Sequence, residues 1–312
     1  MFLRKLKVSI TKLILPFLFK LFQFLKSTSR VTNFFEEKRI LQNNFYDFRP
    51  VINELLKSKK LIGLDVGAQG GFNSDVFFQT KYNKYFETIV VDPLMKDENN
   101  KMHDHVINKG LWSTKGLKKL NILSKRPGSS SMFEPNKDAL KIYGFKEKDY
   151  HLFEIDKTEM VECDTLSSSL KSLKINNLDY LKIDTQGSEL EILKGLGDYR
   201  PLLIKCEVQI FPMYKNSPYW TEVNNHIYQL NYILCDWKKI GSHATRTPAE
   251  MDMIFIPNFL TSAGKKLIKD NEKEFISLLL ICGQIKLLKQ ISEIIDLKYT
   301  EYYKKIEDRY FN

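Results

Sequence analysis

Short apolar runs separated by longer amphipathic stretches fill the chain from residue 61 to residue 257. Apolar runs of about four to eight residues predict buried β-strands, and the periodic stretches between them predict helices. Strands that alternate with helices indicate β-α units around a mostly parallel sheet. The expected fold class is therefore α/β, with a doubly wound, Rossmann-like sheet. The expected parallel strands are Leu61–Val66, Thr88–Asp92, His105–Asn108, Asp179–Asp184 and Leu202–Val208.

Two later apolar runs, Tyr232–Trp237 and Asp252–Pro257, are separated only by a loop. We expect them to pair antiparallel at one edge of the sheet. Residues 117–166 do not fit a β-α unit, because Leu117–Leu123 and Met160–Leu166 have the pattern of strands on either side of a polar loop. We expect this stretch to be an insertion over the active face, where it contacts the substrate.

The two ends of the chain differ from this body. Residues 1–59 are predicted to form a basic helical arm, residues 60–257 the central domain, and residues 258–312 a helical extension. The first 30 residues contain seven Lys and Arg residues and no acid, which is +7 of the net charge of +10. Because the body is nearly balanced in charge, a nucleic-acid partner is not expected.

The first 26 residues have the pattern of a cationic amphipathic helix. Two interpretations stay open, peripheral contact with the inner face of a membrane and packing on the protein's own core. No uncharged run exceeds seven residues, whereas a spanning helix needs about 20. The C-terminal helices are a candidate homodimer surface.

The four cysteines are widely spaced and form no metal-ligand pattern, so no metal is expected. This cysteine usage is typical of a reducing compartment, and we expect a cytoplasmic location.

A glycine-rich turn, Gly67-Ala68-Gln69-Gly70-Gly71, follows the first strand, which carries Asp65 just before it. Glycines at this place let the backbone approach a bound cofactor and turn into the next helix, whose N-terminus carries positive dipole. The turn lacks the G-x-G-x-x-G spacing that seats a pyrophosphate. Asp65 would repel a pyrophosphate, but it suits a ligand that carries an ammonium group and a positively charged sulfur.

Two further acids are expected at the same edge of the sheet. Asp92, followed by Pro93, ends the second strand 25 residues after Gly67, where a carboxylate can accept both ribose hydroxyls of an adenosine. The alternative for Asp92 is a capping role before the proline. Asp184 ends a half-buried strand at the carboxyl edge, where open α/β sheets bind their ligands.

Several motifs occur in an order that resembles the FkbM-type methyltransferases, over about residues 60–257. They are Asp65-Val-Gly-Ala68, Asp92-Pro93, Lys109-Gly-Leu-Trp-Ser113, Cys163-Asp-Thr-Leu166, Leu181-Lys-Ile-Asp-Thr-Gln-Gly-Ser-Glu189, Leu193-Lys-Gly195 and Lys205-Cys-Glu-Val208. Two positions depart from the family pattern, since Gln186 stands where an acid is usual and Gln69 where Asn is usual.

The resemblance implies a class I methyltransferase fold, S-adenosylmethionine as cofactor, and methylation of a hydroxyl oxygen on a sugar, a surface glycan or another metabolite. By resemblance, Asp65, Gly67, Ala68 and Gly71 would line the methionine portion of the cofactor. Asp92 and Pro93 would hold the ribose, and residues near Asn108 would flank the adenine.

Methylation of an alcohol requires a group that accepts the hydroxyl proton. Asp184 and Glu207, each expected at the end of a central strand, are the candidates, and His103 and His105 are the alternatives. A nicotinamide oxidoreductase is the nearest rival enzyme, although none of the fifteen tyrosines has a lysine four residues later, as a Y-x-x-x-K proton relay requires. A third reading is a non-catalytic, methyltransferase-like module tethered to a membrane or a partner.

Overall fold

The computed structural model describes residues 14, 17, 47–95, 102–240 and 248–297. Contacts divide the chain into two compact units, Ser58–Leu278 and the combination of Met1–Lys57 with Leu279–Asn312. Both sheets belong to the first unit. The predicted membrane-contacting arm, residues 1–26, lies outside the described residues except at positions 14 and 17.

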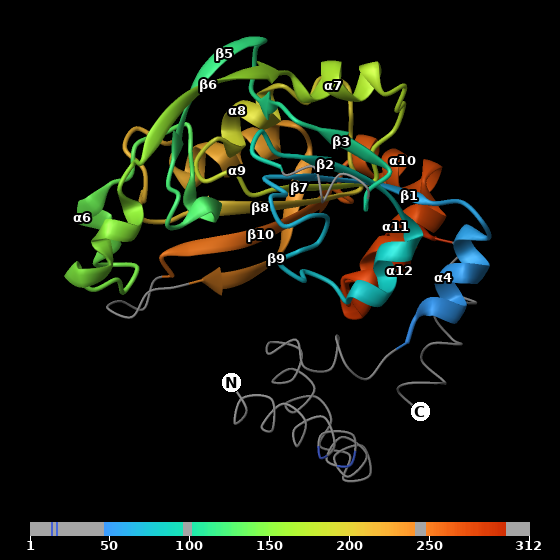
Figure 1. The fold of residues 1–312 in the computed structure, drawn as a ribbon. Helices are drawn as coiled ribbons and strands as arrows, with labels where there is room; N and C mark the ends of the chain where they lie inside the picture. The colour runs from blue at the N-terminus through green and yellow to red at the C-terminus, as the bar shows by residue number, and fades with distance from the viewer. Residues whose placement is uncertain (1–13, 15–16, 18–46, 96–101, 241–247, 298–312) are drawn as a thin grey trace. The chain divides into compact units, whose positions relative to one another are not determined.

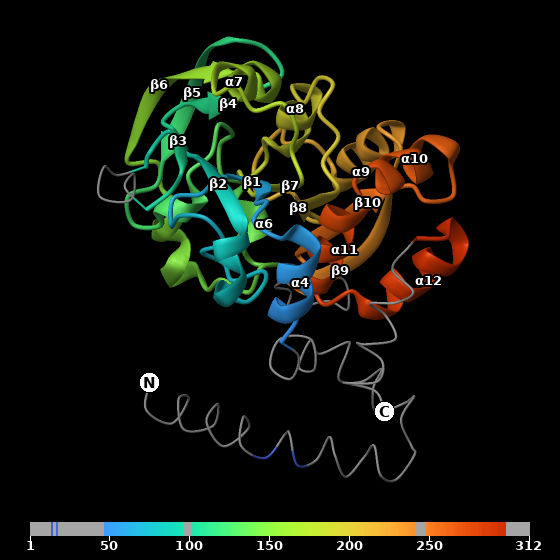
Figure 2. The same cartoon turned by 90° about the vertical axis from the view of Figure 1, so that its right-hand side faces the viewer.

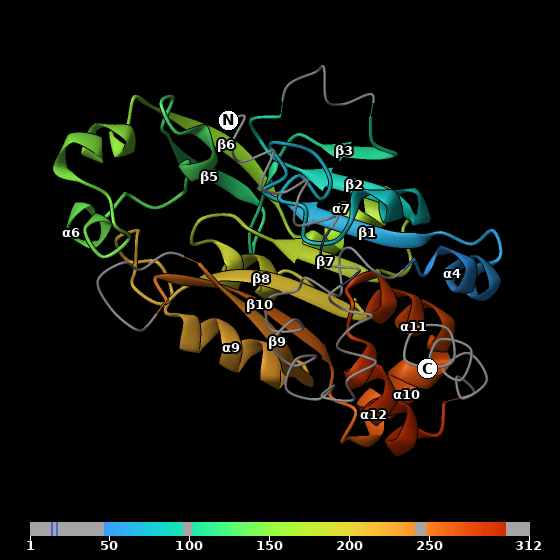
Figure 3. The same ribbon diagram turned by 90° about the horizontal axis from the view of Figure 1, so that it is seen from below.

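A seven-stranded sheet in the order β3-β2-β1-β7-β8-β10-β9 forms the centre of the first unit (Figure 3). The five strands predicted to be parallel are present and pair in parallel. Their near-continuous apolar runs are typical of strands that are covered on both faces. The strands are β1 (Leu61–Val66), β2 (Phe86–Val91), β3 (His105–Ile107), β7 (Tyr180–Ile183) and β8 (Leu203–Gln209).

The antiparallel strand is β10 (Glu250–Pro257), which pairs with β8 on one side and with β9 (Tyr232–Ile240) on the other. The predicted antiparallel pairing of the two runs at one edge of the sheet is confirmed. An antiparallel strand at the edge itself, which the expected fold class included, is wrong, because β10 lies one position in from the edge. The long crossover from β8 through α9 (Trp220–Gln229) carries the chain past one strand position, so β9 becomes the edge strand. The chain then returns and fills the remaining gap with β10.

Three helices cover one face of the sheet (Figure 1). They are α7 (Leu166–Ser172), α8 (Glu189–Lys194) and α9, and their apolar side chains pack with those of the strands in one core cluster. The hydroxyl of Thr165 accepts a hydrogen bond from the Ser168 amide and begins α7 at a defined residue.

No α-helix connects β1 to β2 within the described residues, so the predicted β-α-β unit is wrong at this point. Residues 67–79 form successive turns that lead into the 3-10 helix η1 (Thr80–Tyr85). Val76 has a φ angle of 52°, which an α-helix excludes. Aromatic rings cover this part of the sheet instead, with Phe72, Phe77 and Phe78 packing on Phe86 and Tyr180.

The insertion forms a second, three-stranded sheet in the order β4-β6-β5 (Figure 2). The two strands predicted on either side of a polar loop are β5 (Gly116–Ile122) and β6 (Lys157–Asp164), and they pair antiparallel. β4 (Gly110–Leu111) pairs in parallel with β6. Between β5 and β6 the chain forms η2 (Pro127–Ser129), α6 (Lys137–Leu140) and η3 (Glu147–Phe153).

The predicted C-terminal extension contains α10 (Ser262–Asp270), α11 (Glu272–Ile281) and α12 (Ile285–Ile295), and α4 (Arg49–Leu56) precedes β1. In the described part of the chain, no helix combines the length and the apolar character that crossing a membrane requires.

Candidate active site

A cavity opens at the carboxyl ends of β1, β2 and β7, and it encloses about 630 Å³ of empty space counted to its open mouth. Its walls include Gly67, Asp92, Pro93, Lys109, Asp184 and Gln186. The strand order reverses between β1 and β7, and ligands of open α/β sheets bind at such a reversal. Four predicted site residues, Gly67, Asp92, Pro93 and Asp184, therefore meet around one space.

Gly67 occupies a position that only glycine can take. Its φ angle is 83°, and a Cβ atom at this residue would lie 1.8 Å from the carbonyl oxygen of Asp184. Its amide donates a 2.9 Å hydrogen bond to the carbonyl of Val91 at the end of β2. This close approach joins the glycine turn to the loop after β7.

The other predicted residues of the cofactor end lie outside the cavity wall. Ala68 is fully buried, and Gly71 lies beside His103, whose Nε2 would be 2.9 Å from an added Cβ. Asn108 is exposed, whereas its neighbour Lys109 lines the cavity and forms an ion pair of 2.7 Å with Glu162. Direct contacts from Ala68, Gly71 and Asn108 to a cofactor stay predictions.

Asp92 makes a capping hydrogen bond and also lies at the cavity, and its predicted contact with a ribose stays a prediction. Its Oδ1 accepts a 2.7 Å hydrogen bond from the Leu94 amide, as in a capping turn before a proline, and its side chain also lines the cavity. Burial raises the pKa of Asp92 above its ordinary value, and the bond from Leu94 opposes this rise. The carboxylate is therefore held at the wall by its own turn.

Asp65 is fully buried behind the turn, and its side chain does not line the cavity. Its Oδ2 accepts a 2.9 Å hydrogen bond from the Asn73 amide, and its Oδ1 lies 3.0 Å from the Nζ of Lys182. The carboxylate thus holds the loop after β1 against β7. Its predicted contact with an ammonium group of the cofactor stays untested.

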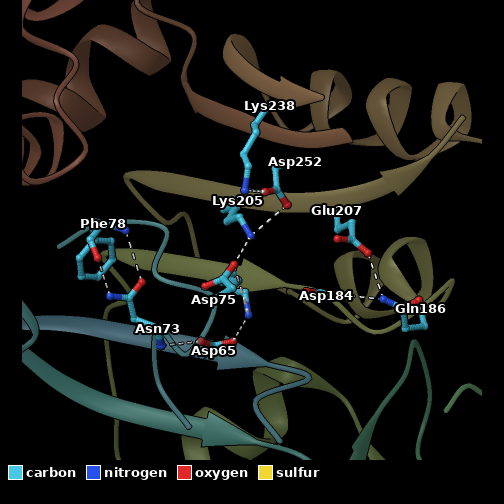
Figure 4. A network of polar contacts seen from close by, with 11 residues as sticks. Asp65, Asn73, Asp75, Phe78, Asp184, Gln186, Lys205, Glu207, Lys238 and Asp252 are labelled. Carbon is cyan, nitrogen blue, oxygen red and sulfur yellow. Dashed lines mark hydrogen bonds and ion pairs between the residues drawn. The ribbon is translucent and has the colours of Figure 1, made fainter. Parts of the chain in front are cut away.

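Asp65 belongs to a larger set of paired charges that we call the buried charge network (Figure 4). Asp75 pairs with Lys205 at 2.6 Å and with Lys182 at 3.9 Å, and Lys205 also lies 3.0 Å from Asp252. The burial of Asp75 acts to raise its pKa, but Lys182 and Lys205 lower that pKa below its ordinary value. The network consists of Asp65, Asp75, Lys182, Lys205, Asp252 and Lys238.

The sequence interpretation missed this network, although a signal for it was present. Lys182 and Lys205 each stand in the middle of an apolar strand, and both are almost fully buried. A buried lysine requires a partner of opposite charge. Two such lysines in neighbouring strands therefore indicate a set of buried carboxylates facing them.

A second polar group, which we call the Gln186 cluster, consists of Asp184, Gln186 and Glu207 (Figure 4). The Nε2 of Gln186 donates to Asp184 Oδ1 at 3.1 Å and to Glu207 Oε1 at 3.0 Å. Asp184 lines the cavity, and Glu207 lies outside its wall, behind Gln186. Burial, and then the charge of Asp184, raise the pKa of Glu207 well above its ordinary value.

The insertion supplies the opposite wall of the cavity. Ser130, Ser131 and Met132 line it, as the predicted position of the insertion over the active face requires. The Ser131 hydroxyl donates a 2.6 Å hydrogen bond to the backbone carbonyl of Gln186, and the Ser130 hydroxyl accepts one from Leu123. These hydroxyls hold the loop in place.

The sequence model of the Methyltransferase FkbM domain matches residues 27–234, which is most of the chain. The chain belongs to the FkbM methyltransferase family. No curated protein matches it. The match covers the glycine turn, Asp92, the insertion and the Gln186 cluster, and it therefore includes every wall of the cavity.

Gln69 and Gln186, the two positions expected from the sequence to depart from the FkbM pattern, line this cavity. The two histidines considered as alternative bases do not line it, and the ring of His105 pairs with Glu87 at 2.8 Å on the neighbouring strand. In the described ranges, no group of three or more His, Cys, Asp or Glu residues is arranged to hold a metal ion.

Proposed function

We propose that the chain is an S-adenosylmethionine-dependent methyltransferase that methylates a hydroxyl oxygen on a sugar, a surface glycan or a secondary metabolite. The observation that carries the proposal is the single cavity that joins the glycine turn and Asp92 at one end to Asp184 at the other. Family membership supports a methyltransferase, and the cavity supports an acceptor that reaches the same space as the cofactor.

The cofactor end is formed by backbone and by carboxylate. Gly67 lets the main chain approach the methionine portion, because no side chain projects from it into the cavity, and Asp92 is placed to accept the ribose hydroxyls. When bound, S-adenosylmethionine supplies a methyl group on a positively charged sulfur. Apolar side chains of Leu111 and Leu120 complete the wall beside this end.

The acceptor end lies next to the cofactor end because the backbone of Asp184 contacts Gly67. The Asp184 carboxylate would orient the acceptor hydroxyl and take its proton during methyl transfer. Geometry favours Asp184 over Glu207 as the base, because Asp184 lines the cavity.

Calorimetry with S-adenosylmethionine tests the cofactor part of the proposal. We expect binding to the wild-type chain and binding weakened about 10-fold or more in Asp92→Ala, from the loss of hydrogen bonds to the ribose. Asp198→Ala, at an exposed aspartate outside the cavity wall, serves as the matched control and should keep the wild-type affinity. The absence of binding heat from the wild-type chain would refute the proposal.

The acceptor part is tested in cells. Surface glycans and small metabolites from cells with and without the gene are compared by mass spectrometry for a species that has lost one methyl group. Complementation with Asp184→Asn should fail to restore that methyl group, while the purified variant still binds S-adenosylmethionine. Restoration by Asp184→Asn would rule out Asp184 as the base.

A further inference from the structure

Gln186 lies at the junction of every segment that forms the acceptor end. It follows Asp184 at the end of β7, its amide nitrogen reaches Glu207 on β8, and its backbone carbonyl accepts a hydrogen bond from Ser131 of the insertion. The Tyr214 hydroxyl, from the loop after β8, lies 3.0 Å from Gln186 Oε1. The φ angle of Gln186 is 58°, an uncommon value for a residue with a side chain. Contacts from three directions therefore hold a strained residue in place.

The chemistry of an amide fits this position and that of a carboxylate does not. An amide has two N–H donors and a carbonyl acceptor, so Gln186 can donate to both carboxyl groups while its oxygen faces Tyr214. A glutamate could accept from Tyr214, but at neutral pH it could donate to neither carboxyl. It would also bring a third negative charge between Asp184 and Glu207.

The surroundings of the cluster make a further negative charge costly. Burial raises the pKa of Glu207, and burial together with neighbouring carboxylates raises the pKa of Glu250 to about 7. The charge of Lys205 acts to lower the pKa of Glu207, and the charge of Arg126 acts to lower the pKa of Glu250. The titratable and charged groups that face the cluster lie on β7, β8, β10 and α8, in the loop after β8 and in the insertion. They are Lys182, Lys205, Glu250, Asp252, Glu189, Tyr214 and Arg126.

We propose, resting on the function proposed above, that Gln186 is a positioning residue: its amide group holds the Asp184 carboxylate at the cavity wall and separates it from Glu207. The amide is then the functional feature of this position. It lets Asp184 stand at the acceptor end with a donor on one oxygen, without a third carboxylate beside it.

Carbon-13 NMR titration of the carboxyl groups tests this without any acceptor. Aspartate and glutamate side chains are labelled at the carboxyl carbon, and the signals are assigned with Asp184→Asn and Glu207→Gln. In Gln186→Glu we expect the pKa of Asp184 to be higher than in the wild-type chain, because a like charge now adjoins it. In Gln186→Ala it should rise by less, because a hydrogen bond to the charged form is lost.

Gln229→Glu, at an exposed position on α9, is the matched control and should leave both titrations unchanged. A purely structural role for Gln186 would lower the thermal midpoint of Gln186→Ala and leave the Asp184 titration as in the wild-type chain. Identical Asp184 titrations in the wild-type chain and in Gln186→Glu, which is nearly isosteric and keeps the acceptor for Tyr214, would overturn the proposal. Calorimetry of S-adenosylmethionine with the same proteins tests the proposed function separately, because that function fails only if the wild-type chain does not bind the cofactor.

Discussion

Two polar groups share one face of the central sheet and differ in how their charges are balanced. Lys205 of the buried charge network and Glu207 of the Gln186 cluster are two residues apart on β8, and side chains two apart on a strand point to the same face. In the network each buried charge adjoins one of opposite sign. In the cluster two carboxyl groups share a neutral amide.

This difference separates a supporting role from a chemical one. Paired charges lower each other's electrostatic energy. In this network they hold the loop after β1, which contains no helix. In the cluster, where no cation among the described residues lies at hydrogen-bonding distance, burial and the charge of Asp184 raise the pKa of Glu207. In the proposed function, the first group supports the cofactor end and the second forms the acceptor end.

The largest expected effect comes from breaking the network at its centre. Lys205→Met leaves the carboxylates of Asp75 and Asp252 without their closest cation, and we expect the free energy of unfolding to fall by about 3–5 kcal/mol. Lys238→Met is the matched control, because that side chain is 55% exposed and lies 3.9 Å from Asp252, and it should cost less than about 1 kcal/mol. Urea denaturation measures both. Equal losses in the two variants would show that the network does not act as a buried unit.

Much of the sheet follows from the sequence, because buried parallel strands leave continuous apolar runs. The strand order at β9 and β10 does not follow from it, since the same two apolar runs fit either order beside β8. The lack of a helix after β1 could not be predicted either. The aromatic contacts that cover the sheet there run from Phe72 and Phe78 to a residue distant in the chain.

The sequence predicted the site residues whose positions depend on the local backbone. It predicted less well those whose positions depend on tertiary contacts. Gly67 and Asp92 were found because a turn and a strand end fix their places. Asp65 was expected at the ligand, but it pairs with Lys182 on a strand that lies more than 100 residues later in the chain. The link from Gln186 to Glu207 depends on the register of β7 beside β8, and an apolar pattern does not specify that register.

An intermediate effect is expected from Glu250, a carboxyl group whose charge acts on Glu207 of the Gln186 cluster. The pKa of Glu250 in the folded chain is about 7, above the ordinary value of 4.5, so the folded state binds more protons between these two values. The free energy of unfolding should therefore fall as the pH rises through this window. Glu250→Gln removes the titrating group and should be more stable than the wild-type chain at pH 8 by about 1–2 kcal/mol, a difference that shrinks toward pH 5.

Urea denaturation at several pH values between about 5 and 8 measures this effect. Glu147→Gln, at an exposed position on η3, is the matched control and should leave the pH dependence unchanged. A wild-type chain whose stability rises across this range would contradict the prediction, because carboxylates with lowered pKa values would then dominate.

The smallest expected effect concerns the link between the insertion and the Gln186 cluster. Ser131→Ala removes the hydroxyl that donates to the Gln186 carbonyl and accepts from the Phe133 amide, and we expect a local cost of about 1 kcal/mol. Amide hydrogen exchange at residues 185–189 should become about fivefold faster, whereas residues 67–71 should exchange as in the wild-type chain. Ser130→Ala, whose hydroxyl bonds within the insertion to Leu123, is the control and should leave residues 185–189 unchanged. Faster exchange in both segments would mean that the acceptor end and the cofactor end open together, so that the two polar groups are one cooperative unit rather than two.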